Sequence, residues 1–163
     1  MSLALDGGEA HEPADALWLQ APLHFADLRT DLTTGAVHSC FAGTTAWFAP
    51  VLRWTHEIDL DPRPRGVADD VGQVSWDGDD LLERGVFAFP GTDGPVPYVE
   101  RWRRLAGDRP VVATVGAGRI RVVAGAHALE VARTATGVAA TSSRLTPAGW
   151  QAVRTVAAAV RNR

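Results

Sequence analysis

Two segments of the chain alternate apolar and polar residues in a way that could support ligand binding or proton transfer: residues 52–60 (LRWTHEIDL) and 96–103 (VPYVERWR). Successive side chains of a β-strand point to opposite faces of its sheet. The side chains that would then share a face are Trp54, His56 and Ile58 in the first segment, and Tyr98, Glu100 and Trp102 in the second. Ionisable groups among aromatic rings are typical of a polar spot inside an apolar cavity.

The same alternation places further charged groups on the bulkier faces of residues 23–31 and 81–89. The resulting candidate ligand-binding residues are Asp27, Arg29, Trp54, His56, Glu83, Tyr98, Glu100 and Trp102. Burying an isolated charge costs several kcal/mol, so these groups must pair with one another, bind a polar ligand, or become neutral. Two interpretations stay open: a structural ion pair of Arg29 with Glu100 or Asp27, and an anchor for a ligand.

Turn residues divide the chain from residue 17 to 141 into about nine or ten predicted strands. The Asp77-Gly78-Asp79-Asp80 sequence, for example, separates two apolar runs and predicts a β-hairpin. Strands at intervals of roughly ten residues, joined by tight turns, indicate an antiparallel up-and-down barrel or a sandwich.

The hydrophobic period changes at Thr146-Pro147, where an N-cap residue precedes a proline at the first position of a predicted helix. Residues 147–161 then carry one apolar stripe at helical spacing, formed by Trp150, Val153, Val156, Ala157 and Val160. We therefore predict a C-terminal amphipathic α-helix over residues 147–161. Because this helix must bury its stripe, the favoured fold class is an all-β barrel with a helix packed on its outside.

Residues 1–16 contain Gly, Glu, Asp and Pro without periodicity, which predicts a disordered tail ahead of a single domain over residues 17–163. The net charge of −3 offers no general attraction to nucleic acid or to anionic membranes. The sequence has no basic, apolar leader and no run of about 20 apolar residues. We therefore expect a cytoplasmic protein that binds neither a membrane nor nucleic acid.

The remaining reactive side chains offer little chemistry. Cys40 is the only cysteine, which excludes an intramolecular disulfide, and the lack of lysine excludes Schiff-base chemistry. His38 and Cys40 have the spacing of two metal ligands on one strand face, but two ligands are too few for a tight site. We expect neither a metal nor a cofactor.

Several short motifs occur in the order that one family shows. They are Trp18-Leu19-Gln20, Phe25-Ala26-Asp27-Leu28-Arg29, Phe41-Ala42-Gly43, Trp54-Thr55-His56-Glu57-Ile58-Asp59, Asp70-Val71-Gly72, Leu82-Glu83-Arg84-Gly85 and Tyr98-Val99-Glu100-Arg101-Trp102-Arg103. With these motifs the chain resembles the lipocalin-like Hri proteins and their bacterial relatives over about residues 17–105. The resemblance implies a calycin-type β-barrel and carries no particular activity.

The function we expect is binding of a small hydrophobic molecule with an anionic or polar head group inside the barrel, where Arg29 and His56 would orient it. One alternative is a small barrel enzyme that performs acid/base chemistry, such as an isomerase, a cyclase or a decarboxylase, with His56 or Glu100 moving the proton. A protein-interaction module with a filled barrel is the other alternative.

Overall fold

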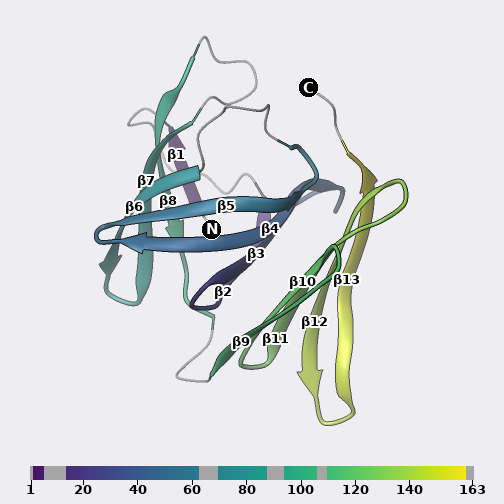
Figure 1. Ribbon diagram of the computed structural model, residues 1–163. Helices are drawn as coiled ribbons and strands as arrows, with labels where there is room; N and C mark the ends of the chain where they lie inside the picture. Colours follow the sequence, from purple (N-terminus) through teal and green to yellow (C-terminus); the bar gives the residue numbers. More distant parts are fainter. Residues whose placement is uncertain (1, 6–13, 63–69, 88–93, 106–109, 161–163) are drawn as a thin grey trace.

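The computed structural model describes residues 2–5, 14–62, 70–87, 94–105 and 110–160 (Figure 1). The regular elements of these residues are β-strands, which confirms the predicted all-β class. In chain order the strands are β1 (Ser2–Leu5), β2 (Asp15–Gln20), β3 (His24–Thr30), β4 (Val37–Phe48), β5 (Val51–Asp59), β6 (Asp70–Asp77), β7 (Asp80–Phe87), β8 (Val96–Trp102), β9 (Val111–Gly116), β10 (Arg119–Ala124), β11 (His127–Arg133), β12 (Gly137–Thr146) and β13 (Gly149–Ala159). Among the described residues, no helix is long and apolar enough to cross a membrane.

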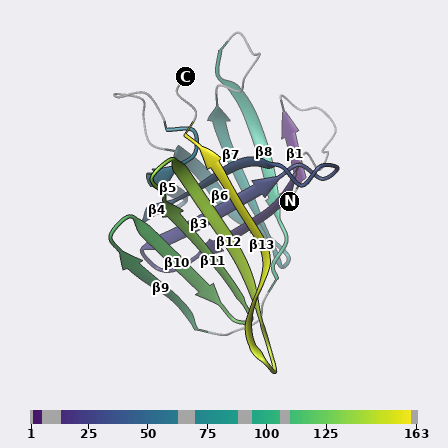
Figure 2. The same ribbon diagram turned by 90° about the vertical axis from the view of Figure 1, so that its right-hand side faces the viewer.

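The strands form two antiparallel sheets that face each other across an apolar core. The larger sheet has eight strands in the order β1-β8-β7-β6-β5-β4-β3-β2, and the smaller has five in the order β13-β12-β11-β10-β9. Figures 1 and 2 show the smaller sheet beside β2, β3 and β4, while the larger sheet curls away from it toward β6, β7 and β8. Within the described residues the edge strands β1 and β2 do not pair with each other, so the larger sheet is an open half-barrel.

Strand β3 is buried on both faces because one face packs against the smaller sheet and the other faces the interior of the curl. Ala26 and Leu28 belong to the apolar core against the smaller sheet. Phe25, Asp27 and Arg29 alternate with them and face the concave side of the larger sheet. The residues that the smaller sheet contributes to the core are Ile120, Val122, Leu129, Val131, Val138 and Ala140. The concave face of the larger sheet is thus free to carry polar groups.

The prediction of a C-terminal helix over residues 147–161 is wrong. Most of this segment forms β13, which pairs with β12 over most of its length. Arg154, Val156 and Ala158 point inward at every second position, whereas Val153 is 69% exposed. Thr146-Pro147 makes a hairpin turn in place of an N-cap, since the hydroxyl of Thr146 accepts a hydrogen bond from the Ala148 amide and donates one to the Gly149 carbonyl. Pairing with β12 therefore overrides a local sequence with helical spacing.

The N-terminal segment also differs from the sequence-based prediction. Residues 2–5 form β1, whose register with β8 runs from Ser2 opposite Arg101 to Leu5 opposite Tyr98. Residues 6–13 of the predicted tail lie outside the described residues. Where the sequence predicted disorder, the structure places a strand at the edge of the larger sheet.

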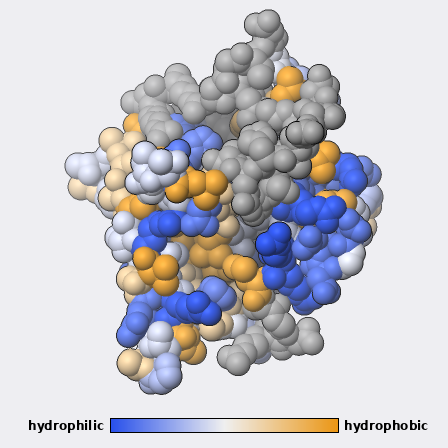
Figure 3. Space-filling model, turned by 180° about the vertical axis from the view of Figure 1, so that it is seen from behind, coloured by the Kyte–Doolittle hydropathy of each residue, from blue (hydrophilic) through white to orange (hydrophobic). Residues whose placement is uncertain are grey.

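Charged side chains on the outer face of β6, β7 and β8 pair with one another. The guanidinium of Arg101 lies 2.7 Å from an Asp77 carboxylate oxygen and 3.2 Å from an Asp80 oxygen. Figure 3 shows hydrophilic side chains gathered over the side of the molecule that β6, β7 and β8 form. The opposite face of the same strands therefore carries the buried residues.

Candidate functional site

The curl of the larger sheet brings distant strands into contact across its concave face. Four strands separate β3 from β8 in the sheet order, yet the Arg29 guanidinium on β3 lies 2.8 Å from a Glu100 carboxylate oxygen on β8. The indole rings of Trp18 on β2 and Trp102 on β8 have centroids 5.1 Å apart. Each predicted ligand-binding residue lies on this face; the group comprises Asp27, Arg29, Trp54, His56, Glu83, Tyr98, Glu100 and Trp102.

Arg29 is held by two carboxylates, so its donors are already engaged. Its Nε donates to an Asp27 oxygen at 3.1 Å, and its terminal nitrogens donate to both oxygens of Glu100 at 2.8 and 3.3 Å. The guanidinium also lies over the Trp102 ring, 5.2 Å from its centroid. The sequence left open whether Arg29 forms a structural ion pair with Glu100 or with Asp27. In the structure it pairs with both acids at once.

Burial and the neighbouring charges shift the pKa values of Asp27 and Arg29. Burial raises the pKa of Asp27, and the nearby Arg29 guanidinium only partly offsets that effect. For Arg29, burial alone would lower the pKa, but Asp27 and Glu100 outweigh it and raise the pKa above its usual range. The arginine therefore stays charged and holds the two acids in place.

Glu83 lies directly opposite Glu100 across β7 and β8 but binds different partners. Its two oxygens accept hydrogen bonds from the Tyr98 hydroxyl at 2.7 Å and from the Trp102 indole N–H at 3.1 Å. Burial, followed by repulsion from Glu100, raises the pKa of Glu83 to about 8. Burial next to Glu83 likewise raises the pKa of Tyr98. The concave face thus contains a carboxyl group whose pKa lies slightly above neutral pH.

Two glycines make room for this carboxyl group. Gly72 on β6 and Gly85 on β7 are register partners. A methyl group on Gly85 would lie within 2.6 Å of Tyr98 ring carbons, and one on Gly72 would lie 2.8 Å from Glu83 Cγ. Close packing of the Tyr98 ring and the Glu83 side chain onto the sheet therefore requires glycine at both positions.

A β-bulge in β5 builds a second polar pair on the concave face. Ala42 pairs with Ile58 and Gly43 with His56, which leaves Glu57 as the extra residue. The bulge reverses the alternation, so Ile58 packs into the core between the sheets and does not share a face with His56 as predicted. A side chain on Gly43 would collide with the carbonyl oxygen of Thr55, so glycine is needed at the bulge.

The same reversal brings Asp59 to the face of His56. Its carboxylate oxygen lies 2.6 Å from His56 Nδ1, so we assign Nδ1 as the donor of this hydrogen bond. The imidazole stacks on Phe41, with ring centroids 4.2 Å apart and planes at 9°. His56 Nε2 is buried without a hydrogen-bond partner among the described residues, and an Asp70 carboxylate oxygen lies 3.8 Å from it.

Trp18, Phe41 and Asp59 complete the site and were missed by the sequence analysis. Trp18 pairs with Asp27 in register, which puts it on the concave face between Trp54 and Trp102. Its indole Nε1 is buried and has no hydrogen-bond acceptor among the described residues. The apolar run Leu17-Trp18-Leu19 was a usable signal for Trp18, because it indicates a strand buried on both faces. No local pattern reveals Asp59, because the bulge decides its direction.

The metal interpretation of His38 and Cys40 gains no support from their surroundings. Cys40 is buried in the core between the sheets, whereas His38 is exposed. Their side chains thus lie in different environments, although they share one strand.

A family model described as Protein HRI1 matches residues 1–149 of the chain. Searches of the curated proteins and of the solved structures return no match. The matched region contains β1 to β12, including all strands of the concave face, and ends at the first residue of β13. The chain therefore belongs to the Protein HRI1 family.

Proposed function

We propose that the protein binds a small, mostly apolar molecule on the concave face of its larger sheet. One observation carries this proposal: two buried nitrogens, Trp18 Nε1 and His56 Nε2, have no hydrogen-bond partner among the described residues. Buried polar atoms in proteins nearly always have a partner, so each calls for a water or a ligand atom. The rings of Trp18, Trp54 and Phe41 supply apolar walls beside these two atoms.

The charges of the concave face favour a neutral head group. Arg29 already binds the carboxylates of Asp27 and Glu100, and Glu83 is a third acid beside them. An anionic ligand that took Arg29 would leave Glu100 buried without a cation, which is unfavourable. A hydroxyl or an amide can accept from the Trp18 N–H and can also form a hydrogen bond with His56 Nε2. We therefore favour the polar head group over the anionic one.

A closed, calycin-type barrel would enclose such a ligand, and the half-barrel curl of the larger sheet is the observation that supports this architecture. The contact between Arg29 and Glu100 already joins opposite walls of the curl. An interior filled entirely by side chains would instead favour a protein-interaction module.

A matched pair of isoprenoid probes tests the proposal. We expect geraniol, an alcohol, to change tryptophan fluorescence on titration, and geranic acid, its carboxylate, to bind at least tenfold more weakly near neutral pH. Trp18→Phe keeps an aromatic wall but removes the N–H, so it should weaken geraniol binding; Trp150→Phe, at a partly exposed position on β13, is the control. Equal affinity for both probes, or binding of neither, would overturn the proposal.

Acid/base catalysis is the second candidate, favoured by the raised pKa of Glu83, about 8. A carboxyl group that ionises near neutral pH can both accept and return a proton. Glu83 replaces His56 and Glu100 as the preferred proton-transfer residue in this hypothesis. Exchange of the α-hydrogens of geranylacetone with D2O, followed by NMR, should then be lost in Glu83→Gln and kept in Glu57→Gln, an exposed control. No exchange with the wild-type protein would exclude this candidate.

A further inference from the structure

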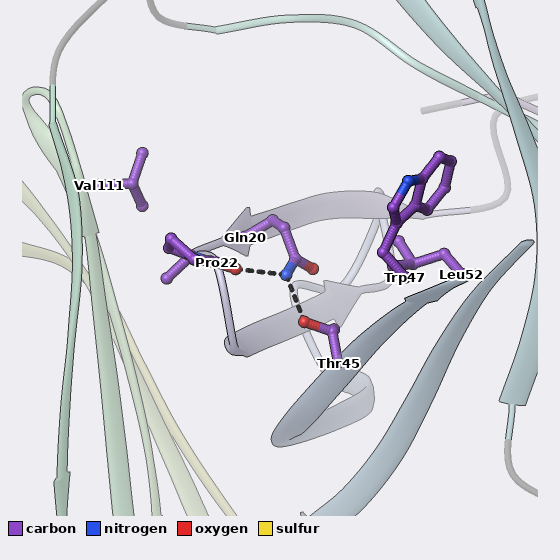
Figure 4. Close-up of a pocket in the computed structure, with 7 residues that line it drawn as sticks. Gln20, Pro22, Thr45, Trp47, Leu52 and Val111 are labelled. Carbon is purple, nitrogen blue, oxygen red and sulfur yellow. Dashed lines mark hydrogen bonds between the residues drawn. The ribbon is translucent and has the colours of Figure 1, made fainter. Parts of the chain in front are cut away.

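A separate pocket opens at one end of the concave face and shares no lining residue with the charged cluster. Its volume is about 490 Å³, within the range of small-molecule sites. It is lined by Gln20, Ala21, Pro22, Thr45, Trp47, Leu52 and Val111, which come from β2, the turn after it, β4, β5 and β9. Figure 4 shows Val111 on one side of the space and Trp47 with Leu52 on the other.

The Gln20 side chain is held in one orientation by its own hydrogen bonds. Its Nε2 donates to the Ala21 carbonyl oxygen and to the Thr45 hydroxyl, the latter at 2.8 Å. Reversing the amide would place its oxygen against the Ala21 carbonyl, so these contacts assign the two amide atoms. Figure 4 shows the amide oxygen pointing toward the side of Trp47 and Leu52.

The Gln20 amide oxygen is the unexplained atom of this pocket. It is buried and lacks a hydrogen-bond donor among the described residues. Pro22, Leu52 and Val111 carry no side-chain donor, and the two lining residues that do, Thr45 and Trp47, form no hydrogen bond to it. Leaving a buried acceptor without a hydrogen bond is unfavourable, and a donor that enters the pocket would remove this penalty.

We propose that this pocket is a binding site for a small molecule with a flat apolar body and one N–H or O–H donor. The donor would meet Gln20 Oε1, and the apolar body would lie against Leu52, Val111 and the ring of Trp47. Trp47 is 56% exposed, so its ring forms a wall that incoming molecules can reach from solvent. This site is independent of the concave-face function, because it uses a different acceptor and different walls.

Two probes of matched shape test the assignment. 2-Naphthol carries an O–H donor, whereas 2-methoxynaphthalene has the same flat body without one. We expect 2-naphthol to shift the NMR signals of the Gln20 side-chain amide and of Thr45, and to bind about fivefold more tightly than 2-methoxynaphthalene, which corresponds to one net hydrogen bond. In Gln20→Met the two probes should bind equally, because the acceptor is gone and the apolar volume remains.

Further measurements separate this proposal from the others. Glu83 does not line this pocket, so Glu83→Gln should leave 2-naphthol binding unchanged, whatever the outcome with geraniol. The wild-type comparison of the two probes needs no variant, so it remains decisive if Gln20→Met fails to fold. Equal affinity of both probes for the wild-type protein, shifts at Trp18 in place of Gln20, or a water on Gln20 Oε1 that 2-naphthol does not displace would each overturn the proposal.

Discussion

Glu83 and Glu100 face each other across β7 and β8 but bind different partners. Glu100 pairs with the guanidinium of Arg29, whereas Glu83 accepts hydrogen bonds from the Tyr98 hydroxyl and the Trp102 indole. Two carboxylates at such a position repel each other unless one of them keeps its proton. Because Arg29 stabilises the negative charge of Glu100, the proton is expected on Glu83, whose pKa is raised to about 8.

The first prediction concerns the pH dependence of stability. Glu83 has a pKa of 4.5 in an unfolded chain and about 8 in the folded protein, so the folded state binds the extra proton between these values. The free energy of unfolding should therefore decrease as pH rises from about 5 to 8, by an amount on the order of a few kcal/mol. Glu83→Gln should flatten this slope, as measured by urea unfolding at several pH values.

Asp27 shifts in the same direction, so part of the slope should remain in Glu83→Gln. Glu57→Gln, at an exposed position, should keep the full slope. A slope that is identical in wild type and Glu83→Gln would contradict the assignment of the proton to Glu83.

The second prediction is that Arg29 is a structural residue. Arg29→Ala would leave Asp27 and Glu100 buried without a cation, which should lower the free energy of unfolding by about 3 kcal/mol. Millimolar guanidinium should partly restore the stability of this variant by entering the vacated place beside Trp102, whereas sodium at the same concentration should not. If thermal unfolding of Arg29→Ala matches that of wild type, the ion pair contributes nothing.

The third prediction tests the glycine beneath Tyr98. Gly85→Ala would press a methyl group against the Tyr98 ring and displace its hydroxyl from Glu83, so we expect a loss of about 2 kcal/mol in unfolding free energy. Gly116→Ala is the matched control, because a methyl group there would meet no atom within 4 Å. Equal urea midpoints for the two variants would show that the Tyr98 packing is not tight.

The fourth prediction separates a strand from a helix at the C-terminus. On the predicted helical stripe Val153 and Val156 would both be buried, whereas in β13 Val156 packs against the core and Val153 is exposed. Val156→Asp should therefore cost about 2 kcal/mol or more, and Val153→Asp about 0.5 kcal/mol or less. Similar losses in both variants, together with a helical far-UV circular dichroism signal, would favour the helix.

Local sequence patterns were sufficient for the strands that carry the candidate site. The Asp77-Gly78-Asp79-Asp80 hairpin forms as predicted, with Gly78 at a positive φ of 61°. The alternation in β3 and β8 also placed Asp27, Arg29 and Glu100 on one face. A two-residue period needs only neighbouring residues to be recognised, and burial on one face imposes that period directly.

Tertiary structure decided the features that depend on contacts distant in sequence. Pairing with β12 made a strand of residues that satisfy helical spacing, and the bulge at Glu57 turned Ile58 away from His56 and Asp59 toward it. The pocket at Gln20 joins β2 to Val111, more than 90 positions later in the chain. Residue order alone does not contain these contacts, because they arise only when the two sheets pack together and the larger one curls.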